Sequence, residues 1–154
     1  MKRSPTNSKS KKKKIQPVSQ SFKCFNGLPI EFTFKGEPVT KSNNGQWFHG
    51  HWCFPARIKN YEKALKVFVQ DWMKKNKLHF TTSLVRMTVV YFYGTKRKKD
   101  LPNLPKTTCD ALEDAAYEND FQVHELHLYR HLDRKNPRVE IRIEEMDDAL
   151  WQKA

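Results

Sequence analysis

The sequence has no apolar run long enough to cross a membrane and no secretory signal. A membrane helix needs roughly 20 consecutive apolar residues. The basic N-terminus is not followed by the apolar stretch that a signal peptide requires. We therefore expect an intracellular, cytoplasmic protein without membrane contact.

Cysteine is scarce, and no internal repeat is visible. Cys24, Cys53 and Cys109 are odd in number and form neither a C-x-x-C pair nor a Cys/His ligand spacing. A disulfide framework and a structural zinc site are therefore not expected. A chain of 154 residues is the length of one domain.

Acidic residues are too few to balance the basic ones, because 29 Lys and Arg residues face 17 Asp and Glu residues, a net charge of +12. Seven cations lie in residues 1–14, which leaves +5 on residues 15–154. Residues 1–20 are rich in Ser, Pro and Lys without periodicity, so we interpret them as a flexible basic tail. One folded domain over residues 21–154 would follow.

The folded part shows alternating strand patterns and one strong helical pattern. Alternation predicts strands over 30–35, 123–132 and 138–144, the second of these with Leu126, Leu128 and Leu132 inward. Residues 84–93 are β-branched and aromatic on both faces, as expected of a central strand. A short aromatic strand is expected near Trp47.

Apolar residues spaced by 3, 4, 3 and 4 predict a core-packing helix over residues 56–76; they are Ile58, Tyr61, Leu65, Phe68 and Trp72. A second helix is expected over 103–116, with Asn103 as N-cap and Pro105 in the first turn. The order β-β-α-β-α-β-β predicts a single α+β domain, in which two helices pack on a mixed sheet.

A carboxylate stands at the end of a basic run in residues 94–106, G-T-K-R-K-K-D-L-P-N-L-P-K. This residue, Asp100, follows the central strand, and Asp120 precedes the next strand. If the two strands are neighbours in the sheet, the two carboxylates can approach each other. Such oxygen ligands suit Mg²⁺ or Mn²⁺.

Cations on both sides of Asp100 fit the same chemistry. Lys106, in the first turn of the second helix, is placed to stabilise a pentacovalent phosphorane. The preceding cations are suited to holding flanking phosphates; they are Lys96, Arg97, Lys98 and Lys99. The spacing indicates a metal-dependent nuclease, although acids at strand and helix ends are also common surface features.

Three stretches resemble the RusA family of Holliday junction resolvases, the crossover junction endodeoxyribonucleases. They are K-K-D-L-P-N-L-P-K, D-A-L at 110–112 and N-D-F-Q-V at 119–123, and F-K-G-E-P-V-T-K-S-N-N is similar to the family's first strand and turn. The resemblance covers residues 28–145. It implies a RusA-like fold and a homodimeric, Mg²⁺-dependent endonuclease of DNA recombination and repair, of bacterial or phage origin. Such an enzyme binds four-way DNA junctions and nicks two opposed strands.

Carried over by position, the resemblance makes Asp100 and Asp120 catalytic metal ligands and Lys106 a catalytic cation. It also matches Asn103, which would lie at the DNA. The departure is Pro102, which stands where the family has a second metal-ligand Asp and offers no side-chain oxygen.

Three explanations are open at Pro102. Water or phosphate fills the missing ligand position, another acid (Asp114, Glu118 or Asp110) replaces the ligand, or the protein binds junctions without cutting them. We favour retained metal chemistry. For Asp110, pairing with Lys106 or a neighbour is the preferred interpretation.

Two further groups of residues have two interpretations each. Lys41, Asn43 and Asn44 either contact DNA phosphates or serve only the turn. Trp47 and Trp52, near two histidines, either stack on unpaired bases at a junction centre or pack into the core.

Overall fold

The computed structural model describes residues 29–41, 45–96 and 101–147. The tail predicted over residues 1–20 lies outside these ranges. No described helix is both long and apolar enough to cross a membrane.

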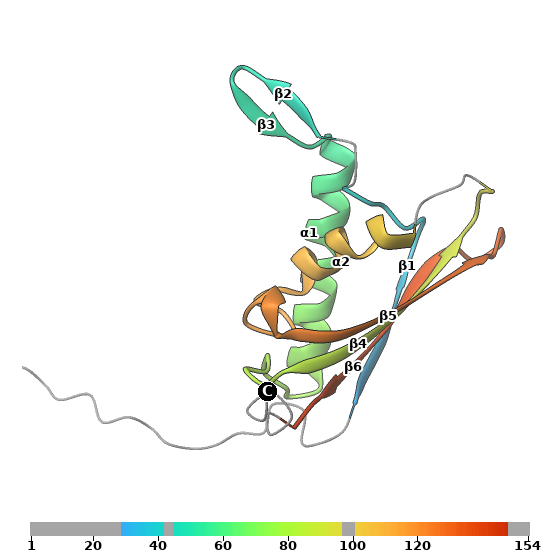
Figure 1. The fold of residues 1–154 in the computed structure, drawn as a ribbon. Coiled ribbons are helices and arrows are strands. Elements are labelled where there is room, and N and C mark those ends of the chain that lie inside the picture. The colour runs from blue at the N-terminus through green and yellow to red at the C-terminus, as the bar shows by residue number, and fades with distance from the viewer. Residues whose placement is uncertain (1–28, 42–44, 97–100, 148–154) are drawn as a thin grey trace, which may run out of the picture.

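A mixed sheet of four strands forms the centre of the fold (Figure 1). Its order is β1 (Ile30–Lys35), β6 (Arg138–Glu145), β4 (Val85–Tyr93) and β5 (Val123–Leu132). β6 is antiparallel to both of its neighbours, whereas β4 and β5 are parallel. The prediction of a central strand over residues 84–93 is confirmed, because β4 has a partner on each side.

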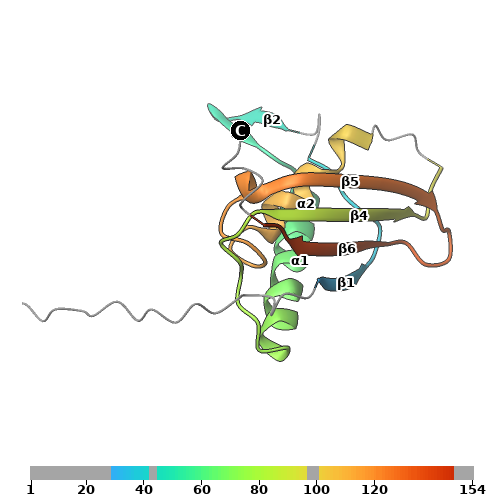
Figure 2. The same cartoon turned by 60° about the horizontal axis from the view of Figure 1, so that its bottom comes forward.

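Two helices cover one face of the sheet (Figure 2). α1 (Ala56–Lys75) matches the predicted helix almost residue for residue, and α2 (Pro105–Leu112) lies beside it. The core between the layers consists of alternate strand residues and the helical stripe; its buried members include Phe32, Leu65, Val69, Met87, Val89, Leu104, Leu112, Ile141 and Ile143. The architecture is therefore the predicted α+β fold with two helices on a mixed sheet.

The aromatic segment after residue 45 forms two strands where one was predicted. β2 (Gln46–Phe48) and β3 (His51–Cys53) make a separate two-stranded antiparallel sheet. This pair, here called the aromatic hairpin (residues 46–53), extends from the N-terminal end of α1 in Figure 1. The element order therefore begins β-β-β.

The leucines of β5 point as predicted but are less buried than predicted. Leu126, Leu128 and Leu132 stand opposite buried residues of β4, so they share the helix-covered face. Only Leu128 packs against the core, while the other two are exposed. The reason is that β5 is an edge strand of the described sheet.

The second helix is shorter than predicted, and its start differs. It ends at Leu112 because Glu113 is extended and Asp114 has a left-handed φ of 59°. Asn103 is not the N-cap as predicted, since it lies in a 3-10 turn, η1 (Leu101–Asn103), and the cap position falls on Leu104. A second such turn, η2 (Asp120–Gln122), precedes β5.

Candidate active site

Helix α2 holds Lys106 on a firmly packed backbone. Leu104, Thr107 and Thr108 are buried, and the Thr108 hydroxyl lies 2.9 Å from the hydroxyl of Tyr91 on β4. Lys106 is the second residue of the helix, and its side chain is exposed. The first turn thus presents a cation to solvent from a fixed position, as the sequence predicted.

Asp120 is the first residue of η2 and lies between two hydrogen-bonded residues, Asn119 and Gln122. The Asn119 carboxamide oxygen accepts from the Phe121 amide at 3.2 Å, and the Gln122 carboxamide oxygen accepts from the Asn119 amide at 2.7 Å. This reciprocal arrangement is a capping box. Asp120 itself is exposed.

Gln122 is a positioning residue to which the sequence analysis gave no role. It is buried, and its amide group donates to the carbonyls of Thr81 at 3.0 Å and Ser83 at 2.8 Å. A buried side-chain amide whose oxygen and nitrogen both have hydrogen-bond partners stabilises a turn more than an exposed one does. The Asn-x-x-Gln spacing of residues 119–122 is the sequence signal from which it could have been found.

The half-buried thiol of Cys109 on α2 is affected by charges on both α2 and η2. The pKa of Cys109 is raised to about 11, chiefly by burial and further by the carboxylates of Asp110 and Asp120, while Tyr117 and Lys106 act in the opposite direction. The Tyr117 hydroxyl also donates to the Cys109 carbonyl at 2.9 Å. α2 and η2 are in contact, so the predicted cation and the predicted carboxylate lie on adjoining elements.

Asp100 lies outside the described residues, so its approach to Asp120 stays a prediction. The strands flanking α2 are indeed neighbours. Parallel pairing alone would separate the two acids, because the end of β4 and the start of β5 are about 30 Å apart along nine residues. η1 follows Asp100 directly in the chain and contacts both α2 and β5.

Lys41 is part of an ion-pair cluster. Its ammonium lies 2.6 Å from a carboxylate oxygen of Glu62 on α1 and 2.6 Å from one of Asp110 on α2. Burial lowers the pKa of Lys41, but the two carboxylates outweigh it and the net pKa is raised. Contact of Lys41 with a DNA phosphate remains a prediction, and it would compete with these pairs.

The three acids considered as substitute ligands lie in different settings. Asp110 pairs with Lys41 and, at 3.7 Å, with Lys106, which confirms the predicted pairing. Asp114 lies 3.4 Å from Lys66 of α1. Glu118 is exposed, one residue before the capping box.

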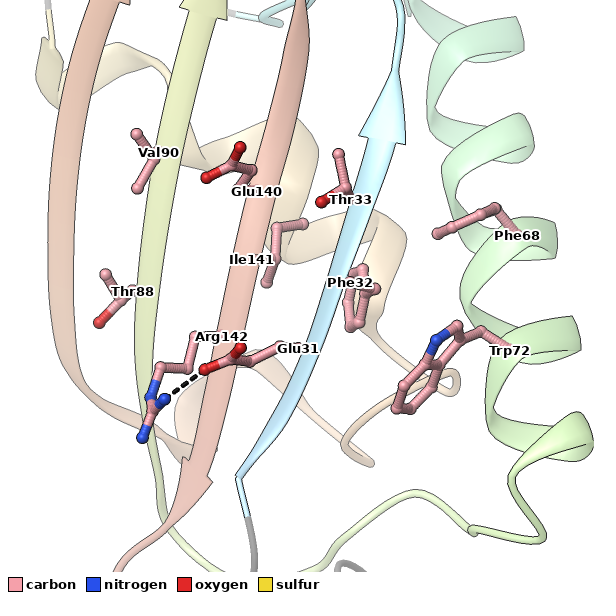
Figure 3. A pocket seen from close by; sticks show the side chains of 10 residues that line it. All are labelled: Glu31, Phe32, Thr33, Phe68, Trp72, Thr88, Val90, Glu140, Ile141 and Arg142. Atoms are coloured by element: carbon pink, nitrogen blue, oxygen red, sulfur yellow. Dashed lines mark hydrogen bonds and ion pairs between the residues drawn. The ribbon is translucent and has the colours of Figure 1, made fainter.

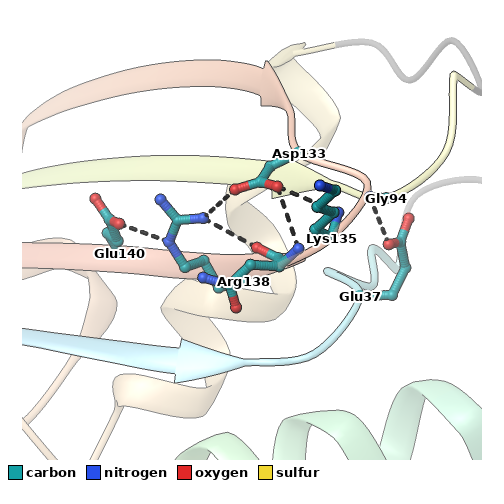
Figure 4. Close-up of polar contacts among 7 residues, drawn as sticks. Glu37, Gly94, Asp133, Lys135, Arg138 and Glu140 are labelled. Carbon is teal, nitrogen blue, oxygen red and sulfur yellow. Dashed lines mark hydrogen bonds and ion pairs between the residues drawn. The ribbon is translucent and has the colours of Figure 1, made fainter.

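The start of the basic run is tied to the body of the protein (Figure 4). The Gly94 amide donates to the Glu37 carboxylate at 2.8 Å, and the Thr95 hydroxyl donates at 3.3 Å. Lys96 follows and is exposed. Five other predicted DNA contacts lie outside the described residues; they are Arg97, Lys98, Lys99, Asn43 and Asn44.

Of the two predicted metal ligands, Asp120 is the one that lies among the described residues. The described residues contain no group of three His, Cys, Asp or Glu side chains able to hold an ion. Asp120 is an exposed hard ligand, and Mg²⁺ commonly uses one or two carboxylates with waters. The donor set therefore fits a hard divalent ion if Asp100 joins it.

A groove of about 650 Å³ lies elsewhere, along β1, β6, β4 and α1 (Figure 3). Two carboxylates, Glu31 and Glu140, are among its lining residues. Its cation, Arg142, is already paired with Glu31 and Glu144. The groove is therefore poorly suited to a phosphate backbone.

Comparison with known families finds a match over most of the described chain. The family model of endodeoxyribonuclease RusA matches residues 35–144, which span β4, α2, η2 and β5. No curated protein matches the sequence. The matched segment contains both Lys106 and Asp120, and it covers most of the described chain. The chain therefore belongs to the RusA endodeoxyribonuclease family.

Proposed function

We propose that this protein resolves four-way DNA junctions by metal-dependent hydrolysis of phosphodiesters in opposed strands. The observation that carries the proposal is that α2, which holds Lys106, contacts η2, which holds Asp120. The family supplies the class of reaction. The excess of cations supports a polyanionic substrate inside the cell.

Each predicted residue of the candidate active site has a proposed role. Asp120 and Asp100 hold Mg²⁺ or Mn²⁺, which when bound activates water and neutralises phosphate charge. Lys106 donates to the phosphate oxygen on which charge develops. Asn103 and the cations from Lys96 to Lys99 position the DNA backbone without reading its bases.

We also propose a homodimer, because a four-way junction offers two symmetric cleavage sites. The edge strand β5 is the surface we favour for it. Leu126, Tyr129 and Leu132 are exposed there, and within the described residues β5 pairs only with β4. An exposed edge strand with apolar side chains favours pairing with another chain.

A second candidate function is junction binding without cutting. Pro102 favours it, because this exposed residue of η1 occupies the position of a family ligand without offering an oxygen. Both functions use the same basic surface. Only the second is compatible with an inert Asp120.

Nicking of a synthetic four-way junction separates the two functions. We expect the wild-type protein to nick it with Mg²⁺ or Mn²⁺ and to leave a linear duplex intact. Asp100→Asn and Asp120→Asn should each lower the nicking rate by at least about 100-fold while retaining junction binding. Asp71→Asn is the matched control, since Asp71 is an exposed carboxylate on α1. Tight binding with no nicking under either metal would refute the enzyme.

The basic tail is proposed to add phosphate contacts without selecting the junction. Removing residues 1–14 deletes seven cations. The dependence of binding on salt should become shallower, because fewer counterions are released. Loss of the preference for junctions over duplex would show that the tail is not accessory.

A further inference from the structure

The aromatic hairpin presents large side chains to solvent. Trp47, Phe48 and Trp52 are 71%, 66% and 54% exposed. Core packing, one of the two interpretations of the tryptophans, is therefore wrong. Exposed apolar clusters of this kind mark interaction sites, and a two-stranded hairpin has little stability of its own.

The rings are nevertheless held in place. His49 and Gly50 have φ values of 47° and 79°, the tight-turn geometry that matches strand twist. Trp47 stands directly opposite Trp52, with ring centroids 5.8 Å apart and an interplanar angle of 71°. Trp52 also lies on the backbone of Gly45, where an added Cβ would come within 2.2 Å of the indole. Ordered rings lose little entropy when a ligand binds.

The charge around the hairpin selects the ligand. The sequence contains no Asp or Glu between Glu37 and Glu62. Arg57 and Lys59, in the first turns of α1 just after the hairpin, are exposed. Exposed aromatic rings followed closely in the chain by exposed cations suit a base with its phosphates, and base stacking on aromatic rings is tolerant of sequence.

A series of contacts joins the hairpin to the candidate active site. The Trp52 ring lies 6.4 Å from that of Phe54, and the Lys41 ammonium lies 5.5 Å from the centre of the Phe54 ring. Lys41 in turn pairs with Asp110, which lies next to Lys106. These contacts link the hairpin, through Phe54 and Lys41, to α2, the helix that carries Lys106.

We infer that the aromatic hairpin stacks on unpaired nucleobases at the open centre of branched DNA, with Trp47 and Trp52 as its platform. The inference rests on the proposed function, since it takes branched DNA as the substrate. It adds the part of that substrate which the hairpin recognises.

Binding measured without divalent metal tests this inference, because no cutting is then needed. The probes are a synthetic four-way junction, a linear duplex and a single-stranded oligothymidine. Trp47→Ala and Trp52→Ala should bind the junction and the oligothymidine about 5-fold or more weakly and the duplex unchanged. The salt dependence should stay the same, because no cation is removed. Trp47→Phe should retain most of the affinity.

Two further variants separate ring position from general damage. Gly45→Ala keeps both indoles but displaces the Trp52 ring, so it should weaken binding as Trp52→Ala does. Phe80→Ala removes an exposed aromatic outside the hairpin and should have no effect. Each variant should retain the wild-type melting temperature.

Several outcomes would overturn the inference. They are unchanged binding by both alanine variants, an equal loss on linear duplex, or a loss that accompanies a fall in molecular mass, since the hairpin would then bind a second copy. If the wild type binds oligothymidine through the tryptophans but does not prefer junctions, the proposed function fails and stacking stands. If the wild type cuts junctions while the alanine variants bind them normally, stacking fails and the function stands.

Discussion

The site region (α2 and η2) and the aromatic hairpin differ in how they hold the side chains they expose. In the site region, Lys106 and Asp120 are exposed on backbones anchored by buried Leu104 and Gln122. The hairpin exposes its tryptophans on two strands of three residues that pair only with each other in the described part of the chain. Catalysis needs groups fixed to within a fraction of an ångström, whereas stacking tolerates adjustment. The difference is consistent with the proposed roles, in which the site region cuts DNA and the hairpin binds it.

The largest expected effect on stability separates the two regions directly. Leu104→Ala should lower the free energy of unfolding by about 2–5 kcal/mol, because it leaves a cavity beside α2. Trp47→Ala should stay within about 0.5 kcal/mol of the wild type. Urea denaturation measures both. An equal loss in Trp47→Ala would show that the hairpin belongs to the core.

The same substitution, Gln to Leu, can be made in both regions, at Gln122 in the site region and at Gln46 in the aromatic hairpin. Gln122→Leu should cost about 1–3 kcal/mol, because the Ser83 carbonyl loses the donor that Gln122 supplies and the Asn119 amide loses its acceptor. The Thr81 carbonyl keeps the Glu118 amide as a donor. The nicking rate of Gln122→Leu should fall more than its junction affinity, since η2 no longer holds Asp120. Gln46→Leu, on exposed β2, is the control and should be neutral. Equal effects of the two changes on stability would contradict the positioning role of Gln122.

Pro102→Asp tests whether the site region has lost a ligand. The residue is exposed, so the fold should tolerate the change. The metal concentration for half-maximal nicking should fall on the order of 10-fold, comparable to the effect of outer-shell partners. Pro102→Asn, which restores side-chain size without charge, should shift it less. An unchanged metal requirement in Pro102→Asp would mean that this position does not reach the ion.

Lowering the pH below about 4.5 should reduce stability through the carboxylates of the sheet and not through the hairpin, which contains no carboxylate. Arg86 holds the pKa of Glu125 on β5 at about 2, below its ordinary value of 4.5. A lowered pKa contributes stability above about pH 4.5 that is lost as the pH falls toward 2. Glu125→Gln should therefore flatten the fall of melting temperature in this window, and Trp47→Ala should leave it unchanged. A slope that Glu125→Gln does not alter would exclude this ion pair as a cause.

The sequence predicted the parts of the fold that follow a regular period. The helical stripe of α1 and the alternation of β6 are such parts, because a buried face imposes its spacing on the sequence. Lys106 was also found, since Pro105 marks the first turn of its helix. The exposure of Leu126 was missed because alternation reports which face a residue is on and not how far the covering helices reach.

Contacts between distant segments escaped prediction. Lys41 meets Glu62 and Asp110 across 21 and 69 residues of chain, and a single sequence carries no sign of such pairs. The exposure of Trp47 likewise follows from the position of its hairpin, because two short strands read the same whether they join a sheet or leave it. The role of Gln122 was readable as a capping spacing, but its buried partners were not.

Junction affinity and junction nicking measured side by side on three proteins separate the two regions most directly. The proteins are the wild type, Asp120→Asn and the double variant Trp47→Ala/Trp52→Ala, with Mg²⁺ or Mn²⁺. We expect Asp120→Asn to bind as the wild type does and to nick at least about 100-fold more slowly. The double variant should bind more weakly and nick at close to the wild-type rate once saturated. Normal nicking by Asp120→Asn, or a parallel loss of binding and nicking in both variants, would contradict this division of roles.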